Sequence, residues 1–236
     1  MTGQPMDVEC IICRSPIIYH REQRLMTCHL CGRIFMSNAE CSKGHYVCDG
    51  CHSKAGIGTL MERCLGSDSK NPVSIAIMLM SSPDIHMHGP EHHVLIGSAL
   101  LTAYSNSVDG FDLQSALKEM ENRGRNVPGS VCGLWGTCGA AISCGMAYSI
   151  ITGTTPLSEE SWGRCMMLTS RCLERIASLG GPRCCKRDGF TALLTAAEYI
   201  DEELGIRLDI PDDVVCTFHE SNMQCLKERC PYHIEP

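Results

Sequence analysis

Eight cysteine and histidine residues between positions 10 and 51 have spacings that suit metal binding. They form three C-x-x-C pairs, the last of which closes a C-x3-H-x2-C-x2-C run. A C-x-x-C turn directs two sulfurs at one ion, and two such turns complete a closed, tetrahedral zinc site. Eight ligands therefore predict two zinc ions, whose binding would fold a segment too small for a core. The predicted ligands are Cys10, Cys13, Cys28, Cys31, Cys41, His45, Cys48 and Cys51.

Two ligand pairings fit this spacing. The sequential pairing joins the ligands of residues 10–31 in one site and those of residues 41–51 in the other. A cross-braced pairing would interleave them, as in the RING-like fingers that the spacing resembles. His29 and His52 lie next to ligands and could replace one. We expect the sequential pairing.

A second group of potential ligands lies near the C-terminus. Cys216 and His219 form a C-x2-H pair, and Cys225, Cys230 and His233 form a C-x4-C-x2-H run. Thiolate and imidazole groups suit zinc or iron, and cysteine thiolates also hold iron–sulfur clusters. The three cysteines are therefore predicted ligands of a third metal, and a tail without metal is the alternative.

The segment His86–His93, with the sequence HMHGPEHH, combines four histidines with a glutamate. Gly89-Pro90 places His88 just before a predicted helix and Glu91 and His92 in its first turn. A helix N-terminus lowers the pKa of a histidine and favours anions. Imidazole and carboxylate together suit a transition metal or acid–base catalysis. We expect His88 to bind metal and Glu91 and His92 to transfer protons, with a solvated surface loop as the alternative.

Glycine and cysteine recur in residues 132–145, CGLWGTCGAAISCG. Glycine destabilises a helix by about 1 kcal/mol relative to alanine. So many glycines indicate the close approach of another backbone, a cofactor or a substrate. Cys132, a candidate ligand, and Cys138, a candidate catalytic group, could meet only if the chain turns between them. A helix that packs closely through small residues is the alternative.

Two adjacent cysteines, Cys184 and Cys185, follow a Gly-Gly-Pro turn and are flanked by Arg183, Lys186 and Arg187. Neighbouring cations and a following helix both favour the thiolate, the reactive form of cysteine. The two cysteines are therefore candidates for a nucleophile, a redox pair or soft-metal ligands. The three cations could instead bind an anionic substrate, and two structural cysteines at a helix start are the plain alternative.

Part of the chain resembles a known family. Cys138–Ala140, the following Gly145 and the later Cys184-Cys185 resemble the C-GCAxxG-C-C family of redox-active, all-helical proteins, although Ser143-Cys144 displaces the motif's glycine. The motifs HGPEHH, CGxWGxCGAA and GGPRCCKR also look like those of a family of cysteine-rich proteins from anaerobic microbes. Such proteins occur beside or fused to methyltransferase domains, which implies a methyltransferase as a partner.

Helical patterns dominate after residue 67. Asn71 can cap a helix that begins at Pro72. No charged residue lies between Asn126 and Ser158, but this stretch is rich in glycine, serine and threonine and therefore predicts an interior helix, not a membrane span. The predicted helices span residues 72–80, 90–104, 112–123, 158–177 and 187–204, and one short strand spans residues 206–210.

Composition bounds the class of protein. A chain of 236 residues can form one full-sized domain and a small module. The net charge of −7 makes a nucleic-acid partner a poor fit, because phosphate binding needs a basic surface. Eighteen cysteines, many in C-x-x-C pairs, together with a start that lacks a signal peptide, predict a reduced, cytoplasmic protein without a membrane span.

These patterns predict a mainly α protein in three parts. Residues 1–66 form a small zinc-ribbon or treble-clef-like module. Residues 67–210 form an all-helical Cys/His-rich domain with the active site, and residues 211–236 form a C-terminal segment.

Two functions fit these expectations. The first is a metal- or thiol-dependent enzyme of redox, sulfur-transfer or one-carbon chemistry, which predicts one pocket joining the histidine and cysteine motifs. The alternative is a zinc-binding adaptor or metal-delivery protein, in which those motifs lie apart. Either takes a small-molecule or protein partner, and either can be an oligomer. The enzyme's site would combine His88, Glu91, His92, Cys132, Cys138, Cys184 and Cys185.

Overall fold

The protein is mainly helical, with a small β-hairpin near its N-terminus. The structure, a computed structural model, describes residues 10–233. The chain divides into two compact units between Lys54 and Ala55, and helix α1 (Asp49–Leu65) crosses this division. The predicted fold class, a small Cys/His module followed by a helical domain, is confirmed.

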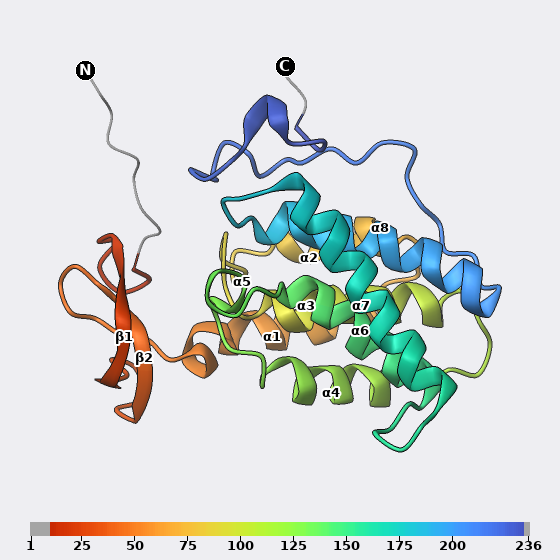
Figure 1. The fold of residues 1–236 in the computed structure, drawn as a ribbon, viewed down its shortest axis with the longest axis horizontal. Helices are drawn as coiled ribbons and strands as arrows, with labels where there is room; N and C mark the ends of the chain where they lie inside the picture. The colour runs from red at the N-terminus through yellow and green to blue at the C-terminus, as the bar shows by residue number, and fades with distance from the viewer. Residues whose placement is uncertain (1–9, 234–236) are drawn as a thin grey trace. The chain divides into compact units, whose positions relative to one another are not determined.

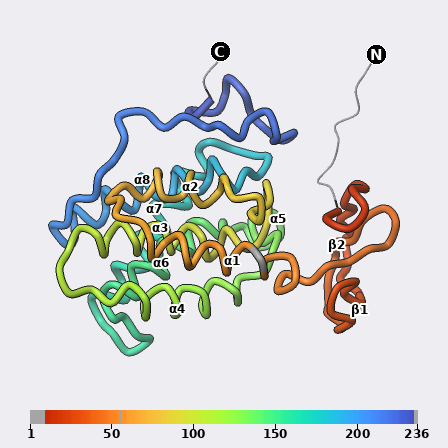
Figure 2. The backbone as a smooth tube through the Cα atoms, turned by 180° about the vertical axis from the view of Figure 1, so that it is seen from behind, coloured from red at the N-terminus to blue at the C-terminus, as the bar shows by residue number. Residues whose placement is uncertain are grey.

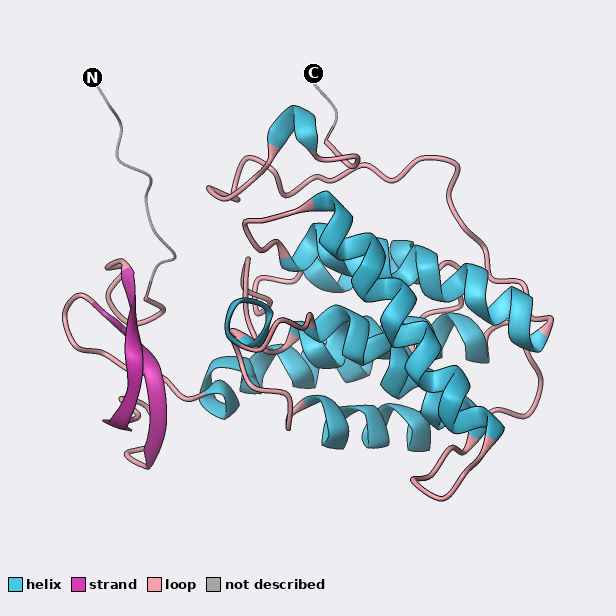
Figure 3. Cartoon of the chain, in the orientation of Figure 1, coloured by secondary structure: helices cyan, strands magenta, loops and turns pink. Residues whose placement is uncertain are grey.

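The N-terminal unit contains a two-stranded antiparallel sheet, drawn in magenta in Figure 3. Strand β1 (Ile17–Thr27) pairs with β2 (Ile34–Cys41), and Ile17 faces Cys41 while Thr27 faces Ile34. These strands were not predicted. Met26 and Cys41 are their only fully buried residues, so no alternation of apolar and polar residues marks them in the sequence.

Helix α1 was also not expected, because we predicted little helical structure before residue 67. Its buried residues Ile57, Leu60 and Cys64 follow a helical spacing. Gly56 lowers the helix propensity of this segment, but it has a packing role. A Cβ at Gly56 would lie 2.7 Å from the carbonyl oxygen of Asp84, so the glycine allows the chain to approach here.

The second unit is a bundle around helix α3 (His92–Ser105), in which every residue from His92 to Ala103 is buried. Helix α3 contacts α2, α4, α6 and α8, as Figures 1 and 2 show from opposite sides. In the described part of the chain, no helix combines the length and apolarity that a membrane crossing requires. The other helices are α2 (Pro72–Met80), α4 (Leu113–Gly124), α5 (Val131–Leu134), α6 (Gly139–Thr152), α7 (Glu160–Leu179) and α8 (Cys185–Leu204).

Helices with a clear local start match the prediction closely. The side chain of Asn71 accepts hydrogen bonds from the amides of Val73 and Ser74, so α2 begins and ends where expected. The predicted strand over residues 206–210 is wrong. The segment forms no strand, and Asp209 makes a single backbone hydrogen bond to Lys70 instead of a ladder.

The C-terminal segment returns over the N-terminal end of α8 (Figure 1). Tyr232 anchors it there. Its hydroxyl lies 2.9 Å from the Thr191 hydroxyl, its ring packs edge-on against Phe190 at 5.6 Å, and its carbonyl accepts the amide of Cys216 at 2.8 Å. The segment contains a short 3-10 helix, η1 (Lys227–Arg229), which directly precedes Cys230. These contacts hold its cysteines and histidines beside the first turn of α8.

Candidate metal centres

The eight N-terminal cysteine and histidine residues form two groups, each able to hold one metal ion. Within each group the ligand atoms lie within 4.8 Å of one another. The groups interleave along the chain, so the pairing is cross-braced and the sequential pairing that we expected is wrong. His29 and His52 belong to neither group of four. The first group is Cys10, Cys13, Cys41 and His45, and the second is Cys28, Cys31, Cys48 and Cys51.

The hairpin explains this pairing. Because Ile17 pairs with Cys41, the end of β2 returns to the first C-x-x-C pair. The second pair, Cys28 and Cys31, lies in the hairpin loop. There the amide of His29 donates to the carbonyl of Tyr46 at 2.8 Å, which brings Cys48 and Cys51 close to this pair. We expected the sequential pairing because the spacing of the cysteines in the sequence does not reveal this long-range contact.

Hydrogen bonds favour a thiolate in each of the first two C-x-x-C pairs. At Cys10 the Ile12 amide donates to the sulfur at 3.4 Å, but burial raises the pKa of this thiol. Hydrogen bonds from Ser15 lower the pKa of Cys13 to about 6. Burial raises the pKa of Cys28, but amides, first that of Cys48, outweigh it and lower this pKa to about 6. Thiolates stabilised in this way are good ligands for a divalent ion.

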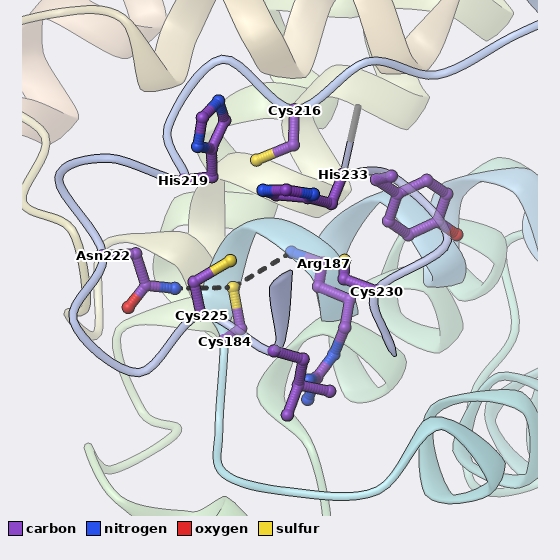
Figure 4. A pocket seen from close by; sticks show the side chains of 10 residues that line it. Cys184, Arg187, Cys216, His219, Asn222, Cys225, Cys230 and His233 are labelled. Atoms are coloured by element: carbon purple, nitrogen blue, oxygen red, sulfur yellow. Dashed lines mark hydrogen bonds between the residues drawn. The ribbon is translucent and has the colours of Figure 1, made fainter. Parts of the chain in front are cut away.

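A pocket lies between the first turn of α8 and the C-terminal segment (Figure 4). The three C-terminal cysteines that we predicted as ligands all line it. They are joined by Cys184, which we had expected to act as a nucleophile, so the structure brings together two motifs that the sequence analysis treated separately. The cysteine pocket, as we call it, contains Cys184, Cys216, His219, Cys225, Cys230 and His233.

Cys184 lies at the N-cap of α8, where its sulfur accepts hydrogen bonds from the Arg187 amide at 3.4 Å and from Asn222 Nδ2 at 3.3 Å. Burial nevertheless raises the pKa of Cys184, and it raises that of Cys185 to about 12. The low pKa expected from neighbouring cations is therefore not found. Without a metal ion, these sulfurs are thiols.

The cations beside these cysteines are used inside the protein. Lys186 is fully buried and donates to the carbonyl of His86 at 2.8 Å. Arg187 is 3% exposed and donates to Asp188 at 2.9 Å and to the carbonyl of Pro182 at 3.0 Å. Of the three predicted substrate-binding cations, Arg183 is the one that is partly exposed.

Glu91 and His92, the predicted acid–base groups, are buried around Lys186. His92 Nδ1 donates to the carbonyl of Gly89 at 3.1 Å, so its Nε2 accepts from Lys186 at 2.9 Å. Burial first, and the Lys186 charge second, hold the pKa of His92 well below its usual value. Glu91 accepts the amide of His86 at 3.0 Å. His92 and the His86 carbonyl thus solvate the buried ammonium group, and the Glu91 charge offsets its positive charge.

His88, the predicted ligand of the histidine motif, contacts the Oδ1 atom of Asn222 through Nε2 at 3.3 Å. Burial, with the charges of Arg183 and Lys186, lowers the pKa of His88 to about 4, so its imidazole is neutral at pH 7. Asn222 was missed in the sequence analysis. A single asparagine in a polar segment has no sequence pattern that marks it as part of a site. Its role follows from its contacts with His88 and Cys184, which are distant in the sequence.

The glycine-rich motif is separate from the cysteine pocket. Cys132 is exposed on α5, and Cys138 lies at the N-cap position of α6, where burial raises its pKa to about 12. Neither is among the residues that line the pocket. Gly139 is needed because a Cβ there would overlap the ring of His93. The seven residues that we expected to form one site therefore do not lie together: Cys184 lines the pocket, and Cys132 and Cys138 do not. Gly139 serves close helix packing.

Comparison with known proteins concerns the helical unit. No curated protein and no solved structure matches the chain. Residues 60–233 match a family model, and this span contains every residue of the cysteine pocket and none of the eight N-terminal ligands. Since the match covers most of the sequence, the chain belongs to the Family of unknown function (DUF5714).

Proposed function

We propose that the protein is a metal-dependent enzyme of redox or sulfur chemistry whose working centre is the cysteine pocket. One observation carries this proposal: four cysteines and two histidines from separate segments line a single pocket. Thiolate and imidazole donors favour zinc, iron or an iron–sulfur cluster. Cys184 and Cys230 are buried in the pocket and the other four donors are partly buried, so protein groups would surround a bound metal.

The number of donors argues for a working site. A structural zinc ion needs four ligands, whereas a catalytic metal keeps a position open for water or substrate. Six donors line this pocket, which exceeds the need of one tetrahedral ion. The surplus suits a multinuclear cluster, or one ion with donors that exchange during the reaction.

The N-terminal groups have the properties of structural zinc sites. Each offers four protein donors, all of them sulfur or imidazole, and such sites are closed. None of the eighteen cysteines, all of which lie in the described residues, is in a disulfide, which is consistent with our proposal of a reducing compartment such as the cytoplasm. We therefore assign two zinc ions to this unit, with a role in folding and not in catalysis.

Anaerobic purification with metal analysis and an absorption spectrum tests the proposal. We expect two zinc ions per chain plus additional metal in the wild-type protein. The variant C216S/C230S should lose the additional metal and keep both zinc ions. The control C132S, which changes an exposed cysteine outside the pocket, should keep all of it. A wild-type protein with two metal ions and an unchanged count in C216S/C230S would overturn the proposal.

A second candidate function, an adaptor that binds a protein partner, is favoured by the surface of the hairpin. Leu25 faces Met36 across the strands, and Ile34 lies two residues before Met36 on the same side. These side chains are 72%, 55% and 63% exposed, respectively. Contiguous exposed apolar groups often mark binding surfaces. An adaptor predicts that L25E/M36E abolishes partner recovery on affinity purification, while C216S/C230S has no effect.

A further inference from the structure

Asn222 connects two motifs that are far apart in the sequence. The residue is 5% exposed and lies in the C-terminal segment, at the edge of the cysteine pocket (Figure 4). Its Nδ2 atom lies 3.3 Å from the sulfur of Cys184, and its Oδ1 atom lies 3.3 Å from Nε2 of His88. Cys184, Asn222 and His88 therefore form a continuous chain of polar contacts.

A third contact fixes the direction of these hydrogen bonds. The backbone amide of Gln224 lies 3.0 Å from Asn222 Oδ1, and an amide N–H can only donate. The atom that it contacts must therefore be the oxygen, which leaves the NH2 group directed at Cys184. Because Oδ1 only accepts, His88 must donate to it through Nε2–H. In neutral His88 the lone pair is then on Nδ1, a buried atom without a hydrogen-bond partner among the described residues.

As a result, the Cys184 sulfur accepts two N–H hydrogen bonds, one from the Asn222 side chain and one from the Arg187 amide. Such N–H···S bonds draw electron density from a metal-bound thiolate. They orient the ligand, lower its nucleophilicity and tune the metal. One donor lies at the start of α8, and the other lies in the C-terminal segment, which Tyr232 anchors to that helix.

We propose that Asn222 is a positioning residue of the pocket's metal centre, which holds the Cys184 sulfur through its amide N–H and links that sulfur to His88 through its carbonyl. This inference rests on the proposed metal centre. It gives the histidine motif a role in the working site that does not require a direct contact with metal.

The substitution Asn222→Asp isolates this role. An aspartate has nearly the same shape and can still accept from Gln224 and His88, but it cannot donate to sulfur. The probe is iodoacetamide, and the readout is the rate at which Cys184 is alkylated in the full-length protein, measured by peptide mass spectrometry. We expect N222D with its metal bound to be labelled about fivefold faster than wild type, as loss of one hydrogen bond implies.

The variant Gln224→Glu is the matched control, because it adds the same charge two residues away without a contact to Cys184. It should be labelled at the wild-type rate. Loss of the pocket metal from N222D alone, with both zinc ions retained, would also support the proposal. An unchanged rate in N222D, or an equal change in Q224E, would overturn it.

The direction of the change separates this inference from the proposed function. In a metal-free thiol, loss of the N–H donor raises the thiol pKa and slows alkylation. In a metal-bound thiolate, the same loss increases nucleophilicity and accelerates it. If the wild-type protein also lacks pocket metal, slower labelling of N222D would therefore refute the metal centre, yet keep the contact between Asn222 and Cys184.

Discussion

Lys186 is a fully buried cation at the end of the bundle where α3 and α8 begin. Burial lowers its pKa, while the charge of Glu91 acts in the opposite direction. The ammonium group donates to the carbonyl of His86 and to His92, and it lies 5.4 Å from the ring centre of Phe218. A buried charge is tolerated only with such partners and a counter-charge.

We therefore expect Lys186→Met to destabilise the protein by about 3–5 kcal/mol, because it removes the buried donor to the His86 carbonyl and to His92 together with the charge that offsets the buried Glu91 carboxylate. The double variant K186M/E91Q should recover a large part of this loss, since it removes both charges. Urea unfolding of the two single variants and the double variant at pH 7 measures the coupling. Strictly additive losses would show that the two charges do not depend on each other.

At this scale, residue types were easier to predict than their roles. The eight N-terminal ligands could be identified because C-x-x-C spacing is itself the local geometry of a metal turn. Glu91 and His92 have the side chains of acid–base catalysts, but His92 accepts from a buried lysine and Glu91 offsets the charge of that lysine. Only the contact between residues 86–92 and Lys186 distinguishes catalysis from stabilisation of the lysine. No local sequence pattern predicts that contact.

Among the helices, the close approach of α3 and α6 depends on glycine. The ring of His93, on α3, lies over Gly139 at the start of α6. His93 Nδ1 also donates to the carbonyl of Val127 at 3.0 Å, so the ring cannot move without losing a hydrogen bond. The glycine at this position thus serves packing, which is the alternative that we had weighed against a bound cofactor or substrate.

We expect Gly139→Ala to destabilise the helical unit by about 1–3 kcal/mol, because a methyl group would overlap the His93 ring. This loss should outweigh the gain in helix propensity of about 1 kcal/mol. Gly133→Ala is the control, since a Cβ at Gly133 meets nothing within 4 Å. Chemical unfolding should show it to be neutral or stabilising. Equal effects of the two substitutions would contradict this account of the packing.

Elements with a local cause could be predicted, and those with a distant cause could not. Asn71 and Pro72 specify the start of α2 by themselves. The hairpin and α1 lack such signals: the hairpin buries few residues, and α1 contains glycine where the chain packs against Asp84. The interleaved ligand pairing follows from the hairpin, so it was missed for the same reason.

The two units of the whole molecule differ in what stabilises them. The helical unit has a continuous core that includes fully buried residues of α2, α3, α6 and α8. In the described part of the N-terminal unit, Met26 is the one buried hydrophobic residue besides ligand cysteines. Burial of so little apolar surface does not offset the loss of chain entropy, so metal binding must supply the difference.

Removal of metal should therefore unfold one unit and spare the other. After treatment with a zinc chelator, we expect proteases to cleave within residues 10–48, while a fragment that contains residues 60–233 persists and most of the helical circular dichroism remains. Cys41→Ser, which removes one ligand of the first group, should increase cleavage there without a chelator. Returned zinc should restore protection in the wild-type protein, because the ions select the folded hairpin from an unfolded ensemble. A chelated protein that stays protected across residues 10–48, or one whose helices melt together with the hairpin, would contradict this division of stability.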